Sequence, residues 1–554
     1  MMGFVTLKNG IFRCALLVFL SSFLLSSWDI GQLGIAATYS DPIEHIRAQD
    51  EALYVNAAIR ITQDGDWLTP KLLGRPFFLK PPLLMWLSAL SIRIFGLSLM
   101  AVRLPSLIFG AAGATAVFVW IARSRSIPAG LFGSAVLVMS PLWQTFSRLC
   151  YTDMLAGSCS ALALVALSID PALERRATAV WFGVFSGAAV LAKSLAGLLP
   201  MAALVLFLAV SHSKLKPIRL VEIALAAVVV AAPWHVYQAL VHPQWFWAEA
   251  IQFQLLGVGL KGMPTGDFSH SSFFYFQRLW QMDPVLAALG LIGLVGFIAT
   301  LRTKPKTSQK PQTSPLLAFC WILVTLTAMF AFQAKNLPYL VFLIPGLVIL
   351  GAVCGPRIPP ALAVSLLLVL FAVKALASDR AWSLRPGAPP LEGAKVMRAY
   401  YDLHRDTELI AAQLDDEFYS ITLPLLRVRY ALVDPPRIVA RAVPYYVPLG
   451  IVLTARQFLS LQDLLPGYQE HLRQWGLHST EPVGTTILLN TPGELSDLVR
   501  ARPQSDFYLP SDWTAVVQAA EPDHWVMRPS PGRVFLLSKS AQPRKFQPAL
   551  PARW

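Results

Sequence analysis

Long apolar runs separated by short polar segments make up most of the first 377 residues of the chain. Each run holds about 20 residues, the length of helix that crosses a bilayer. The runs are residues 11–28, 100–122, 127–146, 153–169, 178–192, 195–210, 218–233, 284–300, 315–333, 337–354 and 359–377. The pattern predicts a mainly α, polytopic integral membrane protein with about 11–13 transmembrane helices. Lys8 and Arg13 lie at the start of the first run, which could instead be a cleaved signal peptide that ends near Ala37.

From about Ser378 the long apolar runs stop and shorter mixed patterns begin. Residues 427–433 and 485–489 are predicted strands, and residues 491–494 are typical of the start of a helix. We therefore expect a transmembrane domain at residues 1–377 and a mixed α/β domain at residues 378–554.

Composition and charge support this division. Of the 554 residues, 55% are hydrophobic and only 14% are charged, and the mean hydropathy is +0.53. Of the formal net charge of +14, residues 1–377 hold +13. Basic residues in membrane proteins set orientation and contact anionic lipid, so we expect membrane lipids, and no nucleic acid, as partners. The five cysteines lie in or beside apolar runs and are interpreted as small core residues: Cys14, Cys150, Cys159, Cys320 and Cys354.

Short basic loops orient the array of helices. If the N-terminus is cytoplasmic, the basic loops near residues 123–125, 174–176, 214–219, 302–310 and 357 all lie in the cytoplasm, as the positive-inside rule requires. Two long outer loops, residues 29–99 and 234–283, then lie outside the cytoplasm. The C-terminal α/β domain is expected on the same periplasmic or extracellular side.

The first outer loop carries an adjacent acid pair, Asp50 and Glu51, at the start of an amphipathic stretch with Tyr54. A carboxylate here could act as a general base, or bind a metal or a cationic substrate. The alternative is structural, because acidic residues also stabilise the N-terminal turn of a helix.

Lys80 precedes two prolines, Pro81 and Pro82, later in the same loop. The prolines stiffen the backbone and predict a helix start at Leu83. A lysine presented in this way at the bilayer surface could bind a phosphate. Alternatively, its aliphatic stem lies along apolar surface while its ammonium group reaches water.

Four further polar residues reach the same outer face by topology: Asp153, Lys193, Lys335 and Tyr339. Asp153 could be an N-cap or a functional acid. A lysine in the position of Lys193 needs a partner or an anion. The convergence of acids and lysines on one membrane face predicts a site there.

At this point the chain resembles the polyprenyl-phosphate-sugar glycosyltransferases of the GT-C fold. The resemblance is to bacterial lipid A aminoarabinose transferases and the protein O-mannosyltransferases of glycosyltransferase family 39. The motifs, which occur in the family's order, are Asp50-Glu51-x-x-Tyr54, Gly65-Asp66-Trp67, Lys80-Pro81-Pro82, Arg103-Leu104-Pro105-Ser106, the Asp153 segment, Leu191-Ala192-Lys193 and Lys335 to Tyr339.

The resemblance implies a GT-C enzyme of the bacterial inner membrane that transfers a sugar from a polyprenyl phosphate donor, with inversion, to a lipid, protein or glycan acceptor. It makes Asp50 the candidate catalytic carboxylate with Glu51 beside it, and Asp153 a second acid. Lys80, Lys193 and Lys335 would hold the donor phosphate, and Tyr339 would shape that site. No spacing indicates a metal ligand set, and a divalent metal is the one cofactor left open.

The chain departs from the family pattern in three places. Leu53 and Leu79 stand where relatives often have Arg and Glu. The second outer loop offers Gln252 and Gln254, with Lys261 and His270 nearby, in place of an acid–histidine pair.

Two other function classes fit parts of the sequence. A transporter or lipid flippase would explain the apolar runs, but not the polar outer loop and the large tail, and the chain has no internal repeat. A non-catalytic relative that binds glycan would explain Leu53 and Leu79.

Overall fold

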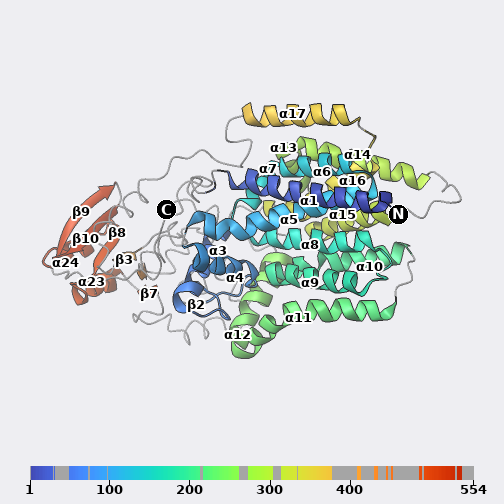
Figure 1. The fold of residues 1–554 in the computed structure, drawn as a ribbon. Coiled ribbons are helices and arrows are strands. Elements are labelled where there is room, and N and C mark those ends of the chain that lie inside the picture. The colour runs from blue at the N-terminus through green and yellow to red at the C-terminus, as the bar shows by residue number, and fades with distance from the viewer. Residues whose placement is uncertain are drawn as a thin grey trace.

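The computed structural model shows a bundle of helices followed by a mixed α/β unit near the C-terminus (Figure 1). The structure describes residues 2–28, 30, 49–72, 75–96, 98–211, 216–260, 273–302, 313–332, 335–357, 359–376, 409–412, 429–433, 445–446, 451–452, 486–489, 492–530 and 533–539. The predicted boundary between residues 377 and 378 lies outside this part of the chain.

The helical part contains long helices and several shorter segments between them. The long helices are α1 (Met2–Ser27), α5 (Leu99–Ser124), α8 (Thr152–Ile169), α9 (Arg176–Lys193), α10 (Leu199–Ser211), α11 (Pro217–Val241), α14 (Pro284–Arg302), α15 (Thr313–Ala331), α16 (Leu340–Cys354) and α17 (Pro360–Leu376). The shorter segments are α3 (Gln49–Asp64), β1 (Lys71–Leu72), β2 (Arg75–Pro76), α4 (Leu83–Phe95), α6 (Ile127–Val138), α7 (Pro141–Ser147), η2 (Ser194–Leu198), α12 (Pro243–Phe246), the π-helix η3 (Trp247–Leu260), α13 (Phe274–Met282) and η4 (Leu337–Tyr339).

Within the described residues, eight helical stretches are long and apolar enough to cross a membrane, or nine when the bent pair α6–α7 counts as one span. One stretch, Arg176–Ser211, comprises α9, η2 and α10. At η2 the chain folds back, because Gly197 lies directly against Ala189 and Val190 of α9. Each predicted apolar run therefore falls mainly on one helix or, for residues 127–146, on the pair α6 and α7. The prediction of a multi-span membrane protein is confirmed.

Close glycine contacts show that three helices of the bundle each run parallel to the second span after them. A Cβ added to Gly183 would meet Ile223, and one added to Gly187, four residues later, would meet Ala227. α9 and α11 therefore run parallel, so α10 crosses back between them. Successive glycines of α5 likewise contact successively later residues of α8, and those of α14 contact successively later residues of α16, so these pairs are parallel too. This alternation brings the start of α8, the end of α9 and the start of α16 to one end of the bundle.

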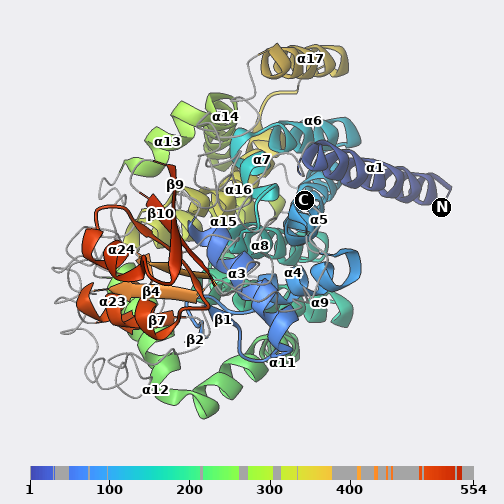
Figure 2. The same ribbon diagram turned by 90° about the vertical axis from the view of Figure 1, so that its left-hand side faces the viewer.

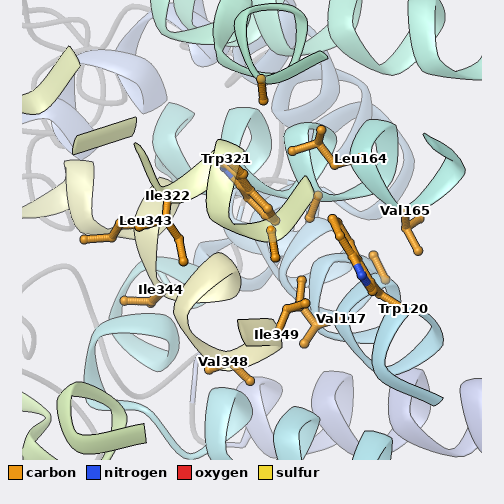
Figure 3. Close-up of a cluster of buried hydrophobic side chains, with 14 of the residues drawn as sticks. Val117, Trp120, Leu164, Val165, Trp321, Ile322, Leu343, Ile344, Val348 and Ile349 are labelled. Atoms are coloured by element: carbon orange, nitrogen blue, oxygen red, sulfur yellow. The ribbon is translucent and has the colours of Figure 1, made fainter. Parts of the chain in front are cut away.

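The main hydrophobic core lies between α5, α8, α15 and α16 (Figure 3). Trp120 of α5 stacks on Trp321 of α15, with ring centroids 6.3 Å apart and planes inclined by 20°. Both indoles are buried, and the Trp120 Nε1–H donates to Ser314 Oγ at 2.6 Å. Such apolar packing leaves no room for polar chemistry here, so the site must lie at an end of the bundle.

The C-terminal unit contains the predicted mixed α/β structure. It is built from β3 (Leu409–Ala412), β4 (Arg429–Val433), β5 (Tyr445–Tyr446), β6 (Ile451–Val452), β7 (Thr486–Leu489), α23 (Pro492–Ala501), β8 (Asp506–Pro510), α24 (Thr514–Ala520), β9 (His524–Ser530) and β10 (Arg533–Ser538). The six-stranded sheet has the order β7-β4-β3-β8-β10-β9. Its strands pair in parallel from β7 to β8, and β10 pairs antiparallel with both of its neighbours, β8 and β9. This unit lies beyond the end of the bundle that carries α3 and β2 (Figures 1 and 2).

Candidate functional site

The acid pair of the first outer loop lies in the first turn of α3, which begins at Gln49. Glu51 is fully buried and forms a two-point ion pair with Arg103 of α5, with Oε1···Nε at 2.8 Å and Oε2···Nη2 at 3.0 Å. Its Oε1 also accepts the backbone N–H of Cys150 at 2.8 Å. Glu51 thus ties α3 both to α5 and to the turn before α8. Its carboxylate is occupied by charge-assisted hydrogen bonds.

Tyr54, one helical turn after Glu51, connects three separate motifs of the chain. Its ring packs edge-on against Phe77, with centroids 6.5 Å apart, and against Tyr151, with centroids 6.1 Å apart. Phe77 lies three residues before Lys80, and Tyr151 lies two residues before Asp153. α3 therefore sets the relative positions of the Lys80 loop and the start of α8.

Asp153, Lys193 and Tyr339 form one cluster, as the alternation of spans predicts. The ammonium group of Lys193 donates to Asp153 Oδ1 and lies 4.6 Å from the centre of the Tyr339 ring. Asp153 is fully buried, and its Oδ2 has no hydrogen-bond partner among the described residues. The N-cap of α8 is Tyr151, so the N-cap alternative for Asp153 is wrong. The cluster combines a fixed cation, an aromatic face and a carboxylate oxygen that can accept a hydrogen bond.

Lys80 lies in the turn before α4, which begins at Leu83 as predicted. It is half-buried, and its Nζ donates to Gln254 Oε1 at 2.9 Å. Gln254 lies on η3, 174 residues away in sequence. The second outer loop therefore contacts the Lys80 loop directly.

Sequence reasoning missed Glu249, a buried acid on η3. Its Oε2 accepts the backbone N–H of Phe78 at 2.6 Å, and the residue is 1% exposed. Burial raises the pKa of this carboxyl group well above its ordinary value, and the hydrogen bond from Phe78 opposes that shift only in part. A lone acid within the apolar stretch from Phe246 to Leu256 was the signal that could have revealed it.

Lys335 occupies a different environment from the other two lysines. Its ammonium group donates to the backbone carbonyl oxygens of Met329, Phe330 and Phe332, at the C-terminal end of α15. These three carbonyls match the three donors of an ammonium group. Burial lowers the pKa of Lys335. In this structure Lys335 thus caps a helix, and it would have to leave these carbonyls to bind a phosphate.

A neighbouring tyrosine of the second outer loop meets the segment after Lys335. Tyr275 of α13 is buried, and its hydroxyl accepts the backbone N–H of Asn336 at 3.3 Å. Burial raises the pKa of Tyr275, and the charge of nearby Asp153 adds to the shift. Tyr275 therefore lies at the edge of the cluster around Asp153.

Some predicted residues lie outside the described side chains. The backbone of Asp50 lies in α3, but its side chain is among those that the structure does not describe, as is that of Gln252; Lys261 and His270 are not described at all. Within the described part of the chain, no three His, Cys, Asp or Glu side chains are arranged to hold a metal ion. The five cysteines are free: four lie within the helices that the apolar runs predicted, and Cys150 lies just before α8.

A protein-family model described as dolichyl-phosphate-mannose-protein mannosyltransferase matches residues 79–237, which include Lys80, Asp153 and Lys193. The undecaprenyl phosphate-alpha-4-amino-4-deoxy-L-arabinose arabinosyl transferase 1 of Sodalis glossinidius is 27% identical over 335 residues, 57% of each chain. The transferase of the same description from Aeromonas hydrophila is 24% identical over 52% of each chain. The chain thus spans little more than half the length of these relatives.

Solved structures extend the likeness to the whole chain. The match to ArnT from Cupriavidus metallidurans, in a crystal structure bound to undecaprenyl phosphate, covers 98% of this chain and 100% of the ArnT chain. The TM-score is 0.64 and the sequence identity is 17%. The same protein in the apo state gives a TM-score of 0.62. At this identity the likeness shows the fold, so the chain has the ArnT-like GT-C fold that its motifs predict.

Proposed function

We propose that this protein is a membrane glycosyltransferase that moves a sugar from a polyprenyl phosphate donor to an acceptor on the outer face of the bacterial plasma membrane. The contact of Tyr54 with Phe77 and Tyr151 carries the proposal, because it joins the acid motif, the lysine motif and the Asp153 segment. The undecaprenyl-phosphate aminoarabinose transferases among the relatives support the same substrate class. The N-terminus would be cytoplasmic and residues 378–554 would lie outside.

The proposed chemistry is displacement of phosphate at the anomeric carbon of the sugar. The Asp50 carboxylate takes the proton of the acceptor group as that group forms the new bond to the anomeric carbon. The bond from the anomeric carbon to the phosphate oxygen breaks, and the lipid phosphate leaves with the electron pair. Attack opposite the leaving group inverts the anomeric centre.

The lysines would stabilise the charge that develops on the departing phosphate. Lys80 and Lys193 would lie at the outer end of the bundle, and Lys193 lies beside Asp153 and Tyr339. Lys335 would add a third cation after release from the end of α15. Glu51 would act through position: its ion pair with Arg103 fixes α3 and thereby the residue before it, Asp50.

The test uses the purified full chain in detergent with radiolabelled undecaprenyl phosphate-linked aminoarabinose and a lipid A fraction. The native protein should release undecaprenyl phosphate and label an acceptor. Asp50→Asn should reduce that release by about a hundredfold or more while the protein remains folded. The matched control is Asp497→Asn, at an exposed position of α23 in the C-terminal unit, which should keep the native rate. Equal rates for native protein and Asp50→Asn would overturn the assignment, and a flippase would leave the donor intact.

A further inference from the structure

The Phe78–Lys80 segment is held from the side by η3, the π-helix of the second outer loop. Glu249 accepts the backbone N–H of Phe78 at 2.6 Å, and Gln254 accepts from Lys80 Nζ at 2.9 Å. One short helix therefore contacts both the backbone before the lysine and the ammonium group itself. π-Helices are rare and recur at functional sites.

The Phe78 side chain adds a third fixed point. Its ring lies 6.2 Å from Trp234, 5.7 Å from His242 and 5.5 Å from Phe246, measured between centroids. All three partners belong to the end of α11 and the α12 segment that lead into η3. Pro81 and Pro82 restrict the backbone on the other side of the lysine. The lysine is thus fixed on both sides, and the second outer loop supplies most of the restraint.

Glu249 is suited to hold a peptide N–H beside a phosphate site. The residue is buried, and Oε1 has no hydrogen-bond partner among the described residues. Burial disfavours the charged form of this carboxyl group and raises its pKa, while Oε2 holds the Phe78 N–H.

We infer that Glu249 is a positioning residue that fixes the backbone of Phe78 and thereby presents Lys80 to the phosphate of its lipid ligand. Gln254 completes this clamp at the lysine side chain. The inference rests on the proposed function for the identity of the ligand. It gives the second outer loop a role in phosphate binding. Leu79, which stands where relatives often have Glu, has no carboxyl group with which to position Lys80.

The test measures the dissociation constant of undecaprenyl phosphate for the full chain in nanodiscs, together with the donor KM and kcat. Glu249→Leu removes the acceptor for the Phe78 N–H and should weaken binding about tenfold to a hundredfold, since small misplacements of binding groups have effects of this size. Glu249→Gln keeps an acceptor oxygen without charge and should bind within about threefold of the native protein. A residue that only stabilised the fold would change the melting temperature without this selective loss of lipid binding.

Three controls separate the outcomes. Gln254→Leu should weaken undecaprenyl phosphate binding less than Glu249→Leu does. If Glu249→Leu does not fold, Gln254→Leu still tests whether η3 positions Lys80. Glu222→Gln, an acid paired with Arg176 and Arg219 at the opposite end of α11, should bind as the native protein does. If Lys80→Ala abolishes binding while Glu249→Leu and Gln254→Leu leave it unchanged, the inference is wrong and the proposed function stands. If the native protein does not bind undecaprenyl phosphate, the proposed function fails and the inference fails with it.

Discussion

Glu51 and Arg103, 52 residues apart in sequence, form a buried two-point ion pair. The side chains of the two residues are 0% and 1% exposed. A carboxylate in this state is not poised to accept a proton from a substrate, because both of its oxygens already accept hydrogen bonds from a cation. Of the adjacent acid pair, Glu51 therefore supports the local structure, and Asp50 remains the candidate base.

Removal of one partner of this ion pair should destabilise the protein strongly. Glu51→Gln should lower the free energy of unfolding by about 3–5 kcal/mol, because it leaves the Arg103 guanidinium buried without a counter-charge. The double variant Glu51→Leu with Arg103→Met should recover part of that loss, but transfer should stay reduced because the ion pair that positions Asp50 is gone. Thermal unfolding in detergent measures both. Asp497→Asn, from a pair with 75% and 62% exposed side chains, should change stability by no more than about 0.5 kcal/mol.

The pair of Asp153 and Lys193 should behave differently, because we assign it to the site. Lys193→Met alone should destabilise the protein by about 3–5 kcal/mol, and adding Asp153→Asn should restore much of the stability. Transfer of the sugar should stay low in both variants. Native rates in the stabilised double variant would show that this pair serves only the fold.

Tyr54 should affect both stability and catalysis through its ring. Tyr54→Ala should cost about 3–5 kcal/mol, since it opens a cavity between Phe77 and Tyr151. Tyr54→Phe keeps the ring contacts and should cost about 1 kcal/mol. If the ring aligns the Lys80 loop with Asp153, the transfer rate should fall in Tyr54→Ala and remain near native in Tyr54→Phe. A rate in Tyr54→Ala that matches the native rate would contradict this alignment.

The buried carboxyl group of Glu249 should make stability depend on pH. Its pKa in the folded protein is raised above the ordinary value of 4.5 by burial, so the folded state holds this proton more tightly than the unfolded state. The contribution is therefore fully present below the unfolded pKa and is lost as the pH rises through the folded pKa. As the pH rises above the ordinary value of 4.5, the native protein should therefore lose stability relative to Glu249→Gln, which does not titrate. A difference in stability that does not change with pH would refute the shift.

The close approach of α9 and α11 should tolerate no side chain at Gly187. A Cβ there would lie 2.6 Å from the carbonyl oxygen of Ala227, so Gly187→Val should destabilise the protein by about 1–3 kcal/mol through overpacking. Gly10→Ala is the control, because its Cβ would meet only Ile127 at an ordinary 3.5 Å. A melting temperature for Gly187→Val at or above that of Gly10→Ala would argue against the packing of the two helices.

The grouping of Asp153, Lys193 and Tyr339 could be predicted from sequence, because spans of fixed length must alternate in direction. The same argument predicted Lys80 on that face, with a helix after its prolines. The partners of each charge could not be predicted in this way. The ion pair of Glu51 depends on the rotation of α3 against α5, which no period in the sequence specifies.

The second outer loop shows a different limit of sequence reasoning. Comparison with relatives directed attention to Gln252 and Gln254, and the departure at Leu79 suggested a missing acid. Glu249 lies in the same loop, and its contact with Phe78 depends on how η3 folds back across 171 residues of chain. The helix-capping role of Lys335 follows from a local rule that places cations near the last carbonyls of a helix.

The antiparallel pairing of α8 and α9 bears on how the protein is made. A single helix with an unpaired acid or lysine partitions poorly into lipid. Asp153 and Lys193 lie 40 residues apart on consecutive helices and meet at the ends of both. As the nascent chain leaves the ribosome, the two helices can therefore enter the bilayer together as a hairpin with opposite charges already matched. Exchange of Asp153 and Lys193 should preserve this insertion. An acid at both positions should slow the insertion of the hairpin into the bilayer.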